Sequence, residues 1–319
     1  MTHRILVTGV GAIIGYGILG SLRQTNLPLR LYGTDIFPDA YGRVLANEFI
    51  PGVRASSDGY LAFIERVVRE HAIDLVIPGI EQDLYALWEK RDRLPTRVVL
   101  NNDLSIGLSR NKLDTYTYFR DRNQPFVIPT RHDASYEACA RDLGVPFLLK
   151  PFSSYASKGL AIVHSREDFE FYSNKLDRKC VYQRIVGNDD SEYTVGVFGD
   201  GAGGALDTII LRRTLSKEGA TAKAAFVASD PAIEACVASI CRLLEPVGPT
   251  NIQLRKEGEQ VFLLEINPRI SSSCSIRTAM GYNEPEMCVR HFLLNEAIVP
   301  APKTAATVVR YIADHVERG

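Results

Sequence analysis

The sequence predicts an α/β protein that begins with a doubly wound parallel sheet and continues as an α+β part. The first observation is length, because 319 residues make about two domains at roughly 150 residues each. The second is the alternation of short apolar runs with amphipathic stretches over about the first hundred residues. The third is a polar break at Asn101–Leu104, after which short strands and hairpin turns prevail.

Apolar runs in the N-terminal part predict buried strands at Ile5–Val7, Arg30–Tyr32, Leu75–Ile77 and Val98–Leu100. The amphipathic stretches between them predict helices at Gly15–Gln24, Tyr60–His71 and Gln82–Arg91. Strands joined through helices form right-handed crossovers, so this sheet is expected to be parallel.

The second part is predicted to mix strands with a few helices. The expected helices are Lys112–Asn123, Asp168–Leu176, Pro231–Leu244 and Met287–Asn295. The expected extended segments are Phe126–Thr130, Phe147–Lys150, Leu160–Val163, Cys180–Arg184, Tyr193–Phe198, Thr208–Arg213, Thr250–Arg255 and Gln260–Ile266. The last two segments flank Lys256-Glu257-Gly258-Glu259 and are expected to pair as a hairpin.

Composition excludes several classes of protein. The 37 basic and 38 acidic residues leave no net field to attract nucleic acid or an anionic membrane, so neither is an expected partner. The uncharged stretch Ile5–Leu22 resembles a membrane signal, but its five glycines favour a strand and a tight turn. The six cysteines form no Cys-x-x-Cys pair, which favours a reduced, cytoplasmic setting.

The hairpin carries a predicted site for a hard cation. Glu265 and Asn267 are two residues apart on one strand, so they point to one face, and Gln253 on the partner strand can join them. Magnesium suits two amide oxygens and one carboxylate, because it completes its shell with water and phosphates. The alternative is a surface hairpin with a polar face, but Asn-Pro-Arg directly after an apolar run favours a site.

A second candidate site is the segment from Phe147 to Val163. Lys150 ends an apolar strand, and the loop after it offers hydroxyl and backbone donors that suit a phosphate. The donors are Ser153, Ser154, Ser157, Lys158 and Gly159. An ordinary serine-rich hairpin is the alternative, and Lys112 by itself is a typical solvated lysine.

These residues, in this order, resemble the ATP-grasp superfamily, and within it a single module of the carbamoyl-phosphate synthase large-subunit type. The likeness spans nearly the whole chain, and it depends above all on Gln253 followed by Glu265-Ile-Asn267-Pro-Arg269. It implies a Rossmann-like pre-ATP-grasp domain at 1–105, a small lobe with a lid at 106–184 and a large lobe with the metal site at 185–319. About 50 residues follow Arg269, so we expect no second module and no carbamoyl-phosphate synthase activity.

The resemblance also implies a role for each site residue. ATP and Mg²⁺, or Mn²⁺ in its place, are the implied cofactors, with Gln253, Glu265 and Asn267 as metal ligands. Arg269, and more weakly Arg213, would stabilise the transferred phosphate. The implied nucleotide-binding residues are Lys112, Lys150, Ser157, Gly159, the hinge residues Gln183, Arg184 and Ile185, and the ribose-binding Glu192.

The implied activity is that of an ATP-dependent carboxylate-amine ligase. ATP would activate a carboxylate as an acyl-phosphate, and an amine would attack it to give an amide, ADP and phosphate. The expected partners are therefore a small carboxylate and a small amine, and Ser271–Ser273, Glu81, Arg277 and Tyr282 are candidates for lining their pocket. Related modules often dimerise through the N-terminal domain, which leaves a homodimer as an open expectation.

Two other functions stay open from the sequence. Gly9, Gly11 and Gly15 follow a strand, and Asp35 follows the next one, as in the dinucleotide fingerprint of NAD(P)-dependent oxidoreductases. The chain has no Tyr-x-x-x-Lys pair of the short-chain dehydrogenases, which counts against that function. A protein that binds ATP without catalysis is the other alternative, and the intact Glu265 and Asn267 count against it.

Overall fold

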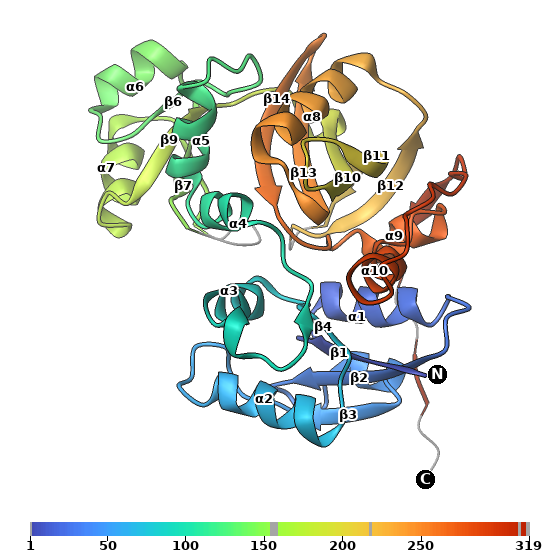
Figure 1. The fold of residues 1–319 in the computed structure, drawn as a ribbon. Helices are drawn as coiled ribbons and strands as arrows, with labels where there is room; N and C mark the ends of the chain where they lie inside the picture. Colours follow the sequence, from blue (N-terminus) through green and yellow to red (C-terminus); the bar gives the residue numbers. More distant parts are fainter. Residues whose placement is uncertain (1, 154–158, 217–218, 312–313, 317–319) are drawn as a thin grey trace.

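The computed structural model describes residues 2–153, 159–216, 219–311 and 314–316. Over these residues the strands form three sheets of five, four and six strands. In Figure 1 the five-stranded sheet lies at the bottom, and the other two sheets form separate lobes above it. This arrangement confirms the predicted α/β class, with a parallel sheet followed by an α+β unit.

The five-stranded sheet is parallel and has the order β3-β2-β1-β4-β5. Its strands are β1 (His3–Thr8), β2 (Leu29–Asp35), β3 (Glu48–Pro51), β4 (Leu75–Ile77) and β5 (Arg97–Val98). The helices around it are α1 (Ile13–Leu22), α2 (Tyr60–Glu70) and α3 (Glu81–Glu89), with 3-10 turns at Tyr41–Leu45 and Arg91–Arg93. The strand order reverses between β1 and β4, and in such sheets ligands bind beyond the carboxyl ends of the strands at this point.

The glycine-rich turn after β1 brings the backbones of β1, β4 and α1 close together. Gly9 has a φ of +59°, which favours glycine, and a Cβ on Gly15 would lie 2.4 Å from the Gly9 carbonyl oxygen. A Cβ on Gly79, just beyond β4, would lie 2.1 Å from the Thr8 oxygen. The glycines of this turn are therefore explained by close packing.

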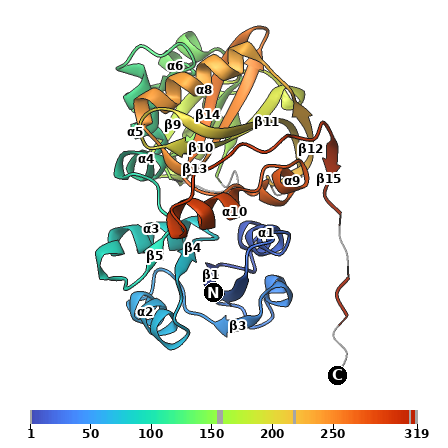
Figure 2. The same cartoon turned by 45° about the vertical axis from the view of Figure 1, so that its right-hand side comes forward.

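The first domain meets the large lobe through α1. This helix packs against α9 (Cys274–Ala279) and α10 (Glu284–Cys288), which lie between it and the six-stranded sheet (Figure 2). The Thr278 hydroxyl lies 2.8 Å from the Ser21 hydroxyl, and the Asn283 amide donates to the Ser21 carbonyl at 3.0 Å. One apolar cluster continues from Ile14 and Ile18 of α1 into this junction.

The four-stranded sheet forms the small lobe and has the order β6-β9-β7-β8, with antiparallel neighbours. Its strands are β6 (Thr130–Arg131), β7 (Phe147–Pro151), β8 (Ala161–Val163) and β9 (Cys180–Arg184). The helices of this region are α4 (Asp103–Ser109), α5 (Lys112–Arg120), α6 (Tyr136–Leu143) and α7 (Arg166–Lys175). An apolar cluster around Phe147, Phe169 and Tyr182 holds α6 and α7 to the sheet.

The six-stranded sheet forms the large lobe and has the order β14-β13-β10-β11-β12-β15, also antiparallel. Its strands are β10 (Glu192–Asp200), β11 (Ala205–Leu215), β12 (Thr221–Val227), β13 (Val247–Glu257), β14 (Gln260–Asn267) and β15 (Thr307–Val309). A 3-10 turn at Asp189–Ser191 precedes β10. The helix α8 (Pro231–Leu244) covers one face, where Val195, Ile240 and Ile252 share an apolar cluster.

Several predicted boundaries differ from the structure. The helix expected at Lys112–Asn123 ends at Arg120, and the late helix expected at Met287–Asn295 is α10 followed by a π-turn at Val289–Leu293. The extended segment Phe126–Thr130 contributes only its last residue to a strand, because Pro125 and Pro129 lack the amide hydrogen that a sheet needs. The predictions missed β3, α4, α6, α9, β12 and β15.

Candidate functional site

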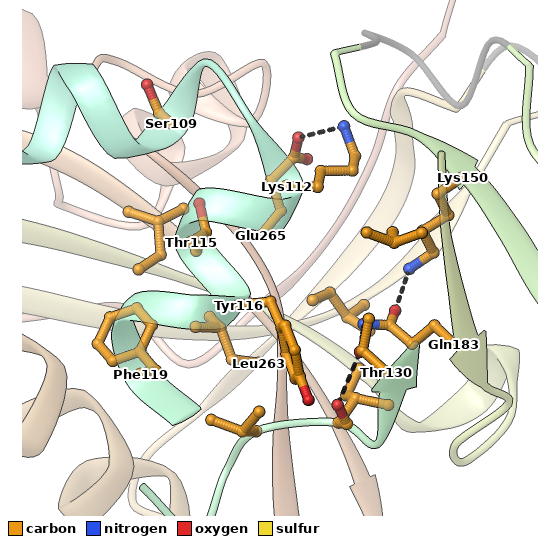
Figure 3. Close-up of a pocket in the computed structure, with 15 residues that line it drawn as sticks. Ser109, Lys112, Thr115, Tyr116, Phe119, Thr130, Lys150, Gln183, Leu263 and Glu265 are labelled. Carbon is orange, nitrogen blue, oxygen red and sulfur yellow. Dashed lines mark hydrogen bonds and ion pairs between the residues drawn. The ribbon is translucent and has the colours of Figure 1, made fainter. Parts of the chain in front are cut away.

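A pocket lies between the two lobes, with α5, β7 and β9 on one side and β14 on the other. Figure 3 shows Tyr116, Phe119 and Leu263 gathered at its apolar end, whereas Lys112, Lys150 and Glu265 lie at its polar end. The remaining lining residues are Ser109, Thr115, Val127, Ile128, Thr130, Val181, Gln183, Leu264 and Ile266. A site with one apolar and one cationic end suits a ligand that carries a flat ring and an anionic tail.

Lys150 is held at the pocket by a chain of hydrogen bonds. Its ammonium donates to the Gln183 side-chain oxygen at 2.6 Å, and the Gln183 amide donates to the Thr130 hydroxyl at 3.0 Å (Figure 3). Burial lowers the pKa of the Lys150 ammonium from 10.5 to about 8, and the positive charges of Lys112 and Arg255 act in the same direction. A bound anion would therefore raise the pKa of Lys150 and keep its ammonium charged.

Lys112 reaches the same pocket from the first turn of α5. The Asn111 side chain caps this helix by accepting from the Leu113 amide at 2.9 Å. The Lys112 backbone amide donates to the Phe152 carbonyl at 2.8 Å, which ties α5 to the end of β7. Its ammonium lies 3.9 Å from Glu265 Oε1. The two lysines of the sequence prediction therefore meet in one cleft, opposite the β13–β14 hairpin.

The hairpin register brings together the three predicted metal ligands. Gln253 pairs with Glu265, and Asn267 lies two residues further along β14, so all three share one face. The Asn267 side-chain nitrogen is buried and finds no partner among the described residues. These are hard oxygen donors of the kind that Mg²⁺ takes together with phosphates and water, so the residues fit that ion. Among the residues that the structure describes, no cluster of three or more His, Cys, Asp or Glu offers a purely side-chain metal site.

Glu192 lies buried at the start of β10, between two arginines. Its Oε1 accepts from Arg213 at 2.7 Å and its Oε2 accepts from Arg255 at 2.9 Å. Arg213 also donates to the Gln253 side-chain oxygen at 2.9 Å. The side chains of Glu192 and Arg213 are only 6% and 4% exposed, so the pair is buried in the large lobe. Its geometry links the predicted ribose-binding residue to a predicted metal ligand.

Arg269 follows β14 directly and connects the large lobe to the first domain. Its Nη2 donates to Glu81 Oε1 on α3 at 2.5 Å and to the Asn267 side-chain oxygen at 3.2 Å. Its Nη1 donates to the Ile270 carbonyl at 3.1 Å. Arg269 and Arg213 therefore each contact one predicted metal ligand, Arg269 at Asn267 and Arg213 at Gln253.

Of the other predicted site residues, some are described by the structure and some are not. Gly159 has a φ of +77° and a Cβ on it would lie 2.8 Å from the Pro151 side chain. Arg184 ends β9 and donates to Glu257 at 3.1 Å, and Ile185 follows it. Ser157 falls outside the described residues, as do Ser154 and Lys158.

Four of the predicted pocket residues are not at a surface, namely Ser271, Ser273, Arg277 and Tyr282. Arg277 and Tyr282 are fully buried, and Arg277 pairs with Glu284 at 2.8 Å. The prediction that they line a substrate pocket does not fit this arrangement, because a buried arginine needs its carboxylate partner. Thr130 and Arg255 were missed, although Arg255 is two residues from Gln253 and therefore shares its strand face.

Comparisons with known proteins show which family and which folds this chain resembles. Residues 188–315 match the family model described as ATP-grasp in the biosynthetic pathway with Ter operon. No curated protein matches the chain.

Solved structures match the chain over almost its whole length. The N5-carboxyaminoimidazole synthetase of Staphylococcus aureus, complexed with ADP, has a TM-score of 0.71 at 16% identity and covers 96% of this chain and 80% of its own. The biotin carboxylase–β-γ-ATP complex of Campylobacter jejuni has a TM-score of 0.72 at 15% identity, covering 95% and 74%. The N5-carboxyaminoimidazole ribonucleotide synthetase of Thermus thermophilus has a TM-score of 0.72 at 19% identity, covering 96% and 82%.

The chain therefore has the ATP-grasp fold, and its resemblance to the ATP-grasp superfamily is confirmed. Over the described residues, no helix is long and apolar enough to cross a membrane.

Proposed function

We propose that the protein is an ATP-dependent ligase that activates a carboxylate as an acyl-phosphate and joins it to an amine. The observation that carries the proposal is that Lys112 and Lys150 of the small lobe and Glu265 of the large lobe line one cleft. Glu265 shares its face of the hairpin with Gln253 and Asn267. Positioned cations around a transferring phosphoryl group are what such chemistry requires, and it needs no protein nucleophile.

The nucleotide would lie along the pocket from its apolar to its cationic end. Tyr116, Val181 and Leu263 would enclose the adenine, and the backbone of Gln183, Arg184 and Ile185 would read its edge. The phosphates would lie against Lys112 and Lys150, with Ser157 and Gly159 contributing donors from the lid. Glu192 would approach the ribose, and Arg213 and Arg255 hold its carboxylate in place.

Gln253, Glu265 and Asn267 would hold Mg²⁺, with Mn²⁺ as a substitute. The bound metal would neutralise phosphate charge and align the terminal phosphoryl group. Lys150 and Lys112 would add positive charge from the opposite lobe, and Arg269 would stabilise the transferred group. The γ-phosphoryl group passes to a carboxylate oxygen, releasing ADP. The amine then forms the C–N bond, the C–O bond to phosphate breaks, and the amine loses a proton.

The domain organisation is part of the proposal. We place the pre-ATP-grasp domain at 1–105, the small lobe at 106–184 and the large lobe at 185–319, because these limits fall between the three sheets. Assembly as a homodimer is a further expectation, tested by light scattering. A reduced, cytoplasmic setting fits the cysteines, which are all free and buried.

ADP release tests the proposal. Purified protein with Mg-ATP, a panel of carboxylates and hydroxylamine as the amine should release ADP and form a hydroxamate only when a carboxylate is accepted. The Glu265→Ala variant should lose this activity, because it removes the one carboxylate of the predicted metal site. Glu259→Ala, in the exposed turn of the same hairpin, is the control and should keep it. Unchanged turnover in Glu265→Ala would refute the ligase.

The two alternatives give different results in the same preparation. A dinucleotide-binding oxidoreductase would be stabilised thermally by NAD(P) and not by Mg-ATP, and a ligand at about 100 times its Kd adds ~2.7 kcal/mol. A silent ATP-binding protein would be stabilised by Mg-ATP but release no ADP with any carboxylate.

A further inference from the structure

The contact between Arg269 and Glu81 places opposite charges beside Asn267, a predicted metal ligand. The two side chains are 14% and 23% exposed, so the pair is neither fully buried nor a loose surface contact. Glu81 is the first residue of α3 and belongs to the first domain, whereas Arg269 follows β14 of the large lobe. A small molecule that reaches this junction meets a cation and an anion together.

Two buried donors beside this pair have no acceptor. Arg269 Nε and the Asn267 side-chain nitrogen are buried and find no hydrogen-bond partner among the described residues. Asn267 as a whole is 5% exposed. Buried donors are normally satisfied, so these two indicate a missing oxygen acceptor on the Arg269 side of the pair. A carboxylate is such an acceptor, and arginine binds it with two parallel hydrogen bonds.

Glu81 decides which carboxylates fit. A plain carboxylate that took the Glu81 place on Arg269 would leave the Glu81 charge unpaired and close to a second negative charge, which opposes binding. A molecule that carries an ammonium group next to its carboxylate removes this conflict, because the ammonium pairs with Glu81 while the carboxylate pairs with Arg269. The exchange replaces one ion pair by two.

We propose that the carboxylate substrate is a zwitterionic α-amino acid, with its carboxylate on Arg269 and its ammonium on Glu81. The inference rests on the proposed ligase function and names the substrate class of that site. Glu81 is then a residue that selects for the ammonium. In the free protein its carboxylate occupies the place on Arg269 that the substrate carboxylate would take.

The position of the pair suits the transfer step. Arg269 contacts Asn267, a predicted metal ligand, at 3.2 Å. On the α3 side, the Tyr85 hydroxyl lies 3.3 Å from that of Ser109, which lines the nucleotide pocket. The amino acid carboxylate would thus lie at the phosphate end of the cleft. One of its oxygens takes the γ-phosphoryl group, the bond from that group to ADP breaks, and the α-ammonium stays on Glu81 and takes no part in the reaction.

The test compares amino acids with their des-amino analogues. Wild-type protein with Mg-ATP and hydroxylamine is supplied with each proteinogenic amino acid, and with matched acids such as propionate for alanine and glutarate for glutamate. We expect at least one amino acid to give ADP and its hydroxamate, with kcat/KM roughly a hundredfold or more above that of its analogue. A des-amino acid that works as well as its amino acid overturns the inference but leaves the ligase standing. No ADP with any carboxylate overturns both.

Glu81→Gln separates selection from a purely structural ion pair. It keeps the shape but removes the charge, so KM for the amino acid should rise and the preference over the des-amino acid should shrink toward one. Glu89→Gln, at the other end of α3 and paired with Arg110 at the surface, is the matched control and should leave the preference unchanged. If Glu81→Gln lowers thermal stability but leaves the preference intact, the pair only joins the two domains and the inference is wrong.

Discussion

Lys150 is the residue whose charge should decide how the protein responds to pH. Its pKa is lowered to about 8 in the free chain, and bound phosphates would raise it because they favour the ammonium. The affinity for Mg-ATP should then be highest below pH 8. Above pH 8 it should fall by up to about tenfold per pH unit, until the pKa of Lys150 in the complex is reached. Calorimetric titrations from pH 7 to 9.5 would measure this.

The control for this prediction is Lys150→Arg. A guanidinium stays charged throughout the range, so the affinity of this variant should be nearly independent of pH, whatever its absolute value. If the Mg-ATP affinities of the wild type and of Lys150→Arg fall equally with pH, the titrating group is not Lys150.

Gln183 is the neutral hydrogen-bond partner of the Lys150 ammonium. Its oxygen lies 2.6 Å from the Lys150 ammonium, so the isosteric Gln183→Glu places a negative charge at hydrogen-bond distance. This should raise the pKa of Lys150 and move the loss of ATP affinity to higher pH, as the same titration would show. Gln124→Glu should leave the profile unchanged, because that side chain bonds Ser239 at the edge of α8. A profile that moves to lower pH in Gln183→Glu would contradict this account.

At the scale of the elements, the stability of the fold should be sensitive to a single methyl group where β1, β4 and α1 approach one another. A Cβ on Gly79 would lie 2.1 Å from the Thr8 oxygen and 2.8 Å from Gly15 Cα, both of which are backbone atoms that cannot move aside alone. Gly79→Ala should therefore lower the free energy of unfolding by about 1–3 kcal/mol in urea titrations.

The matched control lies in α4. A Cβ on Gly107 meets nothing within 4 Å, and the residue is helical, so Gly107→Ala should stabilise the protein by about 0.5–1 kcal/mol. Equal effects of the two substitutions would show that the turn is not tightly packed.

Local signals account for the elements that the sequence predicts well. The helix α8 matches its predicted bounds because Asp230 caps it and a proline opens it. The hairpin follows from two apolar runs around a turn, and its register gives the shared face of Gln253 and Glu265. By contrast, β15 has three residues and pairs with β12 about 80 positions earlier, a contact that no local pattern contains.

The same limit applies to the site. Strand periodicity predicts which residues share a face, so Gln253, Glu265 and Asn267 lie on one face of the hairpin, as predicted. The contacts of Lys150 with Gln183, and of Glu192 with Arg213 and Arg255, depend on how strands from distant segments are ordered in a sheet. That order is set by packing of the whole lobe and not by the sequence near each residue.

In the whole molecule, the junction between the first domain and the large lobe depends on a buried ion pair in the α9–α10 segment. Arg277 donates to Glu284 at 2.8 Å, to Asn251 at 2.6 Å and to Thr194 at 2.9 Å, and both charged side chains have no exposed area. These helices lie between the large sheet and α1 (Figure 2), and the bonds of Arg277 to Thr194 and Asn251 hold them to that sheet.

Removing one member of this pair should destabilise the whole fold. Arg277→Met leaves Glu284 buried without its cation and should cost about 3–5 kcal/mol in urea unfolding at pH 8. Burial already raises the pKa of Glu284, and losing Arg277, which lowers it, raises it further. A group with a raised folded pKa contributes stability at low pH and loses it as pH rises, so this variant should be less destabilised at pH 5.5 than at pH 8.

Two comparisons make the prediction specific. In Arg277→Met with Glu284→Gln, no unpaired charge remains, so most of the loss at pH 8 should be recovered. Arg290→Met breaks surface pairs with Glu286 and Glu296, where each side chain is at least 25% exposed, and should cost less than about 1 kcal/mol. If the double variant is as unstable as Arg277→Met, shape and not charge holds the junction, and the two domains depend on apolar packing alone.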